Sequence, residues 1–138
     1  MQQDPDRDIG THDVALRGAQ GDSRGQLTVT RAVTREWTLE LSAGGRHWHG
    51  GGTDLFAALR DLRRGLDRDG LVIGVNGARP ECAVSGMLAD MGEGRQVYVL
   101  TVPRISGRPE MIRTLGSAPL DEVSDVTTQD EHKHRWLA

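Results

Sequence analysis

Hydrophobic and polar residues alternate along three early segments of the chain, 26–33, 36–42 and 46–49. Apolar side chains at every second position are typical of a strand with one buried face and one face in water. Gly44 and Gly45 stand between the second and third segments, and glycine supplies the positive φ angles that tight hairpin turns require. The pattern therefore predicts an antiparallel meander of three strands.

A helical period follows the glycine run 50–52. We expect this glycine run to break the sheet. Leucines recur from Leu55 to Leu66 at spacings of four, three and four, so they lie on one stripe of a helix. Thr53 or Asp54 can accept the free amide hydrogens of the first turn, and Gly70 is placed to end the helix. The outward face of this main helix is predicted to carry Arg60, Arg63, Arg64 and Arg68.

Two short and continuously apolar runs, 71–75 and 96–102, are typical of strands covered on both faces. They are separated by the long connection 76–95. Beyond them, Pro109 is placed at the first position of a short helix. Thr128 opens a Thr-x-x-Glu capping-box pattern, which predicts the start of a C-terminal helix.

The order of these elements predicts an α+β fold. Strands before and after the main helix imply a mostly antiparallel sheet of about five strands, with the main amphipathic helix and shorter C-terminal helices on one side. Residues 1–25 are charged and hold few aliphatic side chains, so we predict a flexible polar N-terminal tail. Only 14–16 is a candidate for an ordered piece within it. The remaining residues, 26–138, are enough for a single domain with one modest core.

Composition narrows the classes of function. The formal net charge of −3 argues against a sequence-independent grip on nucleic acid, which needs a basic face. No run approaches the ~20 apolar residues of a membrane span. The single cysteine, Cys82, cannot form an internal disulfide, so we expect a cytoplasmic protein. No motif indicates a cofactor.

The connection 76–95 concentrates polar side chains among four glycines after an apolar strand. Long connections in compact domains are usually functional or disordered. Its apolar residues, Met87 and Met91 among them, argue against disorder, and 85–91 can form a helical turn or two. The candidate binding residues are Asn76, Arg79, Ser85, Asp90 and Arg95. The purely structural alternative is a tightly wound connection in which Arg79 and Asp90 pair with each other.

Two hypotheses for function follow from this connection. The first is a small non-catalytic protein-interaction factor, of accessory, adaptor or immunity type, that docks another protein through residues 76–95. The alternative is a small enzyme or small-molecule binder that holds an anionic ligand with Asn76, Arg79, Ser85 and Asp90. In that case Arg79 would bind a carboxylate or phosphate bidentately, and Asp90 would serve as the base.

A metal site and a cysteine nucleophile are weaker hypotheses. His47 and His49 lie two residues apart on one face of a strand, a geometry that can bind a metal when further ligands join it. No complete ligand set is visible, so they stay weak candidates and no metal is predicted. Cys82 has no histidine placed near it and is expected to be a small buried apolar residue.

Several motifs around the connection form a wider pattern. They are Asn-Gly-Ala-Arg at 76–79, Ser-Gly-Met at 85–87 and Asp-Met-Gly-x-Gly-Arg-x-Val-Tyr-Val-Leu at 90–100, preceded by the helix start 54–60. This pattern resembles a family of small uncharacterised proteins from high-GC, actinomycete-type genomes. The resemblance covers about residues 53–101 and implies no particular chemistry. Val84 stands where the family pattern has a proline.

Overall fold

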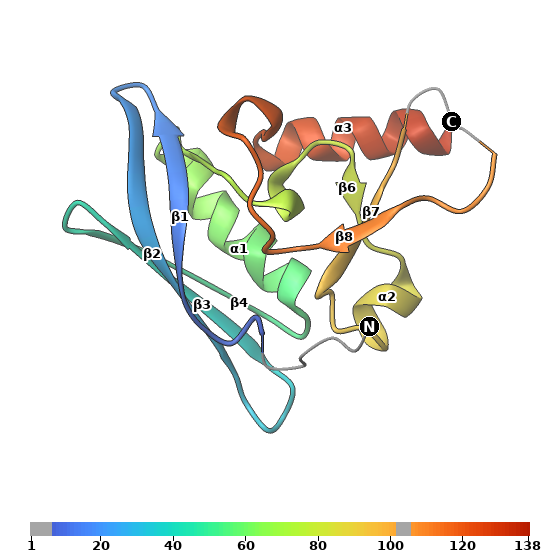
Figure 1. The fold of residues 1–138 in the computed structure, drawn as a ribbon, viewed down its shortest axis with the longest axis horizontal. Helices are drawn as coiled ribbons and strands as arrows, with labels where there is room; N and C mark the ends of the chain where they lie inside the picture. The colour runs from blue at the N-terminus through green and yellow to red at the C-terminus, as the bar shows by residue number, and fades with distance from the viewer. Residues whose placement is uncertain (1–6, 102–105) are drawn as a thin grey trace.

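The computed structural model describes residues 7–101 and 106–138, which form two antiparallel sheets and three helices (Figure 1). The larger sheet has the strand order β4-β3-β2-β1-β5. Its strands are β1 (Gly10–Gly18), β2 (Gly21–Arg31), β3 (Trp37–Ala43), β4 (Arg46–Gly52) and β5 (Val72–Ile73). The predicted α+β class with a five-stranded antiparallel sheet is confirmed.

The second sheet has three strands in the order β6-β7-β8. These strands are β6 (Cys82–Ala83), β7 (Gln96–Val99) and β8 (Met111–Arg113). The helices are α1 (Leu55–Arg68), α2 (Gly86–Asp90) and α3 (Val126–Leu137), with 3-10 turns η1 (Asn76–Ala78) and η2 (Leu120–Glu122). Figure 1 shows α1 between the larger sheet on one side and the smaller sheet with α3 on the other.

The predicted meander is confirmed in β2, β3 and β4. Trp37, Leu39 and Leu41 are buried, while the side chains between them are more exposed. Gly44 and Gly45 have φ angles of 55° and 79°, as a two-residue hairpin turn requires. The alternation of side chains therefore places one face of the sheet in the core and the other in water.

The predicted flexible tail over residues 1–25 is wrong from Asp8 onward. β1 pairs with β2 along its whole length and with β5 on its other side. Val14 and Leu16 are buried in the core. Two aliphatic side chains suffice here because β2 pairs with the whole of one side of β1, and β5 pairs with Leu16 and Arg17 on the other. Residues 1–6 of the predicted tail lie outside the described residues.

Asp8, immediately before β1, links the N-terminal segment to the smaller sheet. Its side chain is buried and accepts from Arg95 Nε at 3.0 Å and from Arg113 Nη2 at 2.8 Å. Two guanidinium groups offset the cost of burying this carboxylate. The segment before β1 is therefore part of the fold.

The glycine run 50–52 does not break the sheet, because β4 continues through Gly52. The reason is the close approach of α1. A Cβ atom on Gly50 would lie 2.4 Å from Leu62 N and 2.5 Å from Ala58 O. Only glycine lets the helix backbone come this near to the strand.

The two apolar runs become short strands in different sheets. β5 is a two-residue edge strand of the larger sheet, not a central one, and β7 is the middle strand of the smaller sheet. Val102, at the end of the second run, lies outside the described residues. The two runs therefore support separate apolar clusters. The smaller cluster joins Phe56 of α1 to Cys82 and Val97.

The C-terminal predictions are confirmed in part. The short helix expected from Pro109 is wrong, because residues 111–113 form β8 and pair with β7. The C-terminal helix is present, but Asp125 caps it by accepting from Thr128 N at 2.8 Å. It thus begins three residues before the position that the capping-box pattern indicated. None of the helices in the described part of the chain has the length and apolarity needed to cross a membrane.

Candidate functional site

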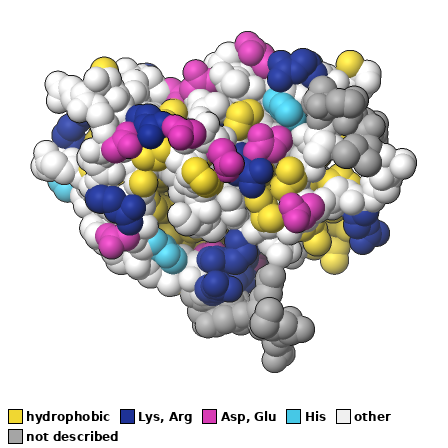
Figure 2. Space-filling model, turned by 45° about the horizontal axis from the view of Figure 1, so that its top comes forward, with side chains coloured by type: hydrophobic (Ala, Val, Ile, Leu, Met, Phe, Trp, Pro, Cys, Tyr) yellow, Lys and Arg dark blue, Asp and Glu magenta, His cyan; other side chains and the backbone are white. Residues whose placement is uncertain are grey.

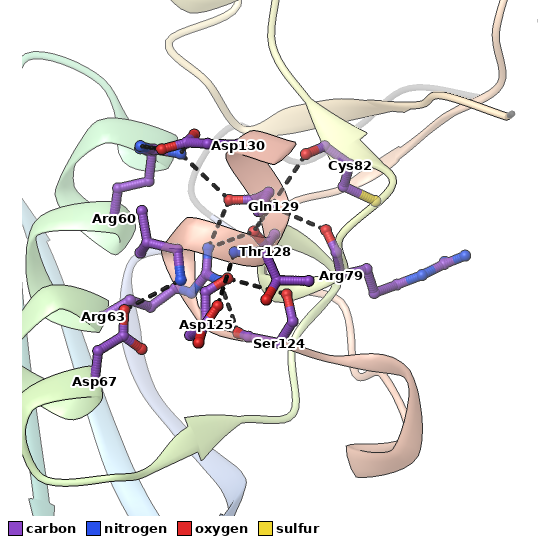
Figure 3. A network of polar contacts seen from close by, with 12 residues as sticks. Arg60, Arg63, Asp67, Arg79, Cys82, Ser124, Asp125, Thr128, Gln129 and Asp130 are labelled. Atoms are coloured by element: carbon purple, nitrogen blue, oxygen red, sulfur yellow. Dashed lines mark hydrogen bonds and ion pairs between the residues drawn. The ribbon is translucent and has the colours of Figure 1, made fainter. Parts of the chain in front are cut away.

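The N-terminal half of the connection 76–95 is fixed by one buried glutamine of α3 (Figure 3). Gln129 Nε2 donates to the carbonyl oxygens of Gly77, Arg79 and Cys82 at 2.8, 2.9 and 3.0 Å. Its Oε1 accepts from Arg63 Nη1 at 2.8 Å. A single side chain thus satisfies three backbone carbonyl groups of this largely irregular segment.

Arg63 was predicted to face solvent, but it is only 2% exposed. Besides Gln129, it donates to Gly77 O at 3.2 Å and to Ser124 O at 2.8 Å. Burial lowers the pKa of Arg63 to about 10, so it remains a cation at neutral pH. The prediction is wrong because α3 covers this flank of α1, and the position of α3 is not visible in the helical period.

The C-terminal half of the connection is fixed by Glu93. Its carboxylate accepts from Arg31 Nε at 2.7 Å and from Trp37 Nε1 at 3.2 Å. Arg35 Nη2 donates to Asp90 O at 2.7 Å, which joins α2 to the loop between β2 and β3. The hydrogen bond from Arg31 holds the pKa of Glu93 below its usual value. Polar contacts therefore fix both ends of the segment.

Replacing Glu93 by glutamine is expected to lower the free energy of unfolding by about 1 to 2 kcal/mol at pH 7. The depressed pKa gives stability that is present above pH 4.5, the ordinary value, and is lost as the pH falls through the folded-state pKa. The difference between wild type and Glu93→Gln should therefore shrink toward pH 3. Urea unfolding at both pH values measures it, with exposed Glu131→Gln as the control. A difference that is the same at both pH values would contradict the role of this carboxylate.

The side chains of Asn76 and Arg79 bond to other residues of the fold. Asn76 Nδ2 donates to Arg113 O at 3.0 Å. Arg79 Nε pairs with the carboxylate of Glu81, not with Asp90 as the structural alternative supposed. These two side chains therefore hold the connection in place.

The side chains of Ser85 and Arg95 also have bonding partners within the fold. Ser85 Oγ caps α2 by accepting from Leu88 N at 3.1 Å, and Arg95 pairs with buried Asp8. Asp90 is exposed, and no described residue donates to its carboxylate. Of the five candidates, Asp90 alone turns its side chain to solvent without a partner among the described residues. The five do not converge on one cavity.

The most exposed part of the connection is the outer face of α2. Met87 and Met91 lie one helical turn apart and are 71% and 78% exposed. They do not pack into the fold, in contrast to the expectation that they help to order this segment. Together with Asp90 between them, they form what we call the α2 face. The signal in the sequence was two methionines at a spacing of four.

The chain matches no family model, and no curated protein is significantly similar to it.

A groove of about 350 Å³ lies between α1, β6 and α3, and Phe56, Arg64, Cys82 and Lys133 are part of its lining. None of the five candidate residues lines it. Burial raises the pKa of Cys82 to about 12, so the thiol stays protonated and is a poor nucleophile. The Cys82 thiol therefore gives no support to a cysteine nucleophile at this groove.

His47 and His49 lie on the solvent face of β4. In the register of the sheet they stand opposite Ser42 and Glu40. Among the described residues, no group of three or more His, Cys, Asp or Glu side chains is arranged to hold a metal ion. The pair remains two exposed histidines beside one carboxylate.

Proposed function

We propose that the protein is a small non-catalytic interaction factor that docks another protein through the α2 face. The observation that carries the proposal is the exposure of Met87 and Met91 on a segment whose backbone is fixed at both ends. Exposed methionines supply flexible and polarisable contact area, and they are enriched at protein-binding surfaces. Fixing the segment beforehand lowers the entropy lost on association.

The chemistry of the α2 face indicates which groups a partner must provide. Two methionine side chains fit an apolar pocket, and the Asp90 carboxylate between them fits a lysine or arginine at the rim of that pocket. The loop between β2 and β3, which contacts α2 through Arg35, adds Val33, which is 99% exposed. A partner with an apolar depression flanked by a cation would bury both methionines.

The charge distribution supports a protein partner. Acidic and basic side chains are interspersed over the face drawn in Figure 2, so this face has no extended basic surface for a phosphate backbone. The one cysteine is free and buried, which is consistent with action in the cytoplasm, the location that we propose. Such a factor would act by occupying a surface of its partner.

Site-specific cross-linking tests the proposal. A photoreactive amino acid at position 87 should capture one partner protein in cells, whereas the same amino acid at Leu137 on α3 should not. With the captured partner purified, Met87→Glu combined with Met91→Glu should raise the dissociation constant by about tenfold or more, since buried anchors contribute more than 1 kcal/mol each.

Leu137→Glu is the matched control, because Leu137 is also an exposed apolar residue, 60% accessible, and lies on a different helix. It should leave both the affinity and the unfolding free energy unchanged. Equal binding by the doubly substituted protein, or capture from position 137 in place of position 87, would exclude the α2 face as the docking site.

A further inference from the structure

β4 ends the larger sheet, and β3 is its only neighbouring strand in the described part of the chain. It contains neither proline nor lysine, two residues that protect exposed edges from further pairing. Gly51 N–H points away from β3, since it donates to Asp61 Oδ2 at 3.0 Å. Backbone groups on a strand point alternately to its two sides, so His47 and His49 also present their N–H and C=O groups at the free edge.

The flank of α1 beside this edge carries two charges of opposite sign. Asp61, Gly65 and Arg68 follow one another at spacings of four and three and therefore share this flank. Asp61 and Arg68 are exposed, and neither forms an ion pair with any described residue. Gly65 lies over the middle of β4, because a Cβ atom there would be 3.4 Å from Trp48 Cδ1.

We propose that two copies of the chain associate through this edge, with β4 antiparallel to β4 about a two-fold axis at Trp48. His47 of one copy then pairs with His49 of the other, and Gly51 keeps its bond to Asp61. The two larger sheets become one continuous sheet. A two-fold axis makes each contact occur twice, because both copies use the same surface.

The charges on α1 favour a second copy over a foreign strand. The same axis places the two α1 helices antiparallel, with Gly65 near the crossing. Asp61 and Arg68 lie on opposite sides of Gly65, four and three residues away, so Asp61 of each copy faces Arg68 of the other. The flank is therefore complementary to itself. This surface is distinct from the α2 face, so the dimer neither requires nor excludes docking there.

Light scattering after size-exclusion chromatography tests the dimer. The full chain should have twice its monomer mass of 15.1 kDa. Asp61→Arg alone and Arg68→Asp alone should each weaken the dimer by about tenfold or more, because each reversal turns two symmetric attractions into repulsions. An equimolar mixture of the two variants should restore the dimer, since in the heterodimer each arginine again faces an aspartate.

Arg135→Asp on α3 is the control and should leave the dimer intact. Thermal unfolding of each variant establishes that it is folded, and His49→Pro, which removes an outward N–H, should also weaken association. A wild-type chain that is monomeric at every soluble concentration would overturn the proposal. So would single reversals that stay fully dimeric, or a mixture that associates no better than its components.

Discussion

Gly50→Ala should destabilise the fold by about 3 kcal/mol or more, which is a large part of the stability of a small domain. The new Cβ would lie 2.4 Å from Leu62 N and 2.5 Å from Ala58 O, both backbone atoms of α1. No rotation of a side chain can relieve these contacts, so α1 must move away from β4. Chemical denaturation monitored by circular dichroism measures the loss.

Gly51→Ala is the matched control for this prediction. Its Cβ would point to the opposite face of β4, where the nearest heavy atom is Trp37 O at 3.6 Å. We expect a change within about 0.5 kcal/mol. Equal effects at the two positions would show that the cost comes from glycine flexibility and not from the close approach of α1.

Arg63→Met should lower the free energy of unfolding by about 2 to 3 kcal/mol. Methionine retains most of the buried volume but donates no hydrogen bond, so Ser124 O loses the guanidinium donor that Arg63 supplies. Gln129 Oε1 also loses the hydrogen bond that it accepts from Arg63 Nη1 at 2.8 Å. Because the same network holds residues 77–82, cleavage within this segment by a protease should become faster than in the wild type.

Arg64→Met serves as the control, since Arg64 is the next residue on α1 and is exposed. Its unfolding free energy should change by no more than about 0.5 kcal/mol. If Arg63→Met were equally mild, the hydrogen bonds of Arg63 would not be needed to hold the connection.

Local patterns were sufficient to predict α1 and the meander of β2, β3 and β4 in the larger sheet. The leucine stripe of α1 and the alternation around Trp37 each depend on residues close in sequence. β1 was missed because Val14 and Leu16 are a weak pattern by themselves, and the strand is stabilised by β2 and β5 on either side. A contribution from distant strands is not visible in a short window of sequence.

The candidate site shows the same limit. The sequence indicated an ordered polar connection, but it could not show which polar groups are already occupied. Asn76 bonds to residue 113 and Arg95 to residue 8, contacts that only the tertiary structure brings together. Nor does a spacing of four show whether Met87 and Met91 point inward or outward on a helix as short as α2.

Methyl and amide NMR on the free protein tests most directly whether the connection is fixed and presents its methionines to solvent. We expect slow hydrogen exchange at the amides of Leu55 and Gly94, which bond to Glu93 O and Leu88 O. We also expect strong broadening of the methyl signals of Met87 and Met91 by a soluble paramagnetic agent. Rapid exchange at both amides, or methyl signals shielded from the agent, would contradict this arrangement.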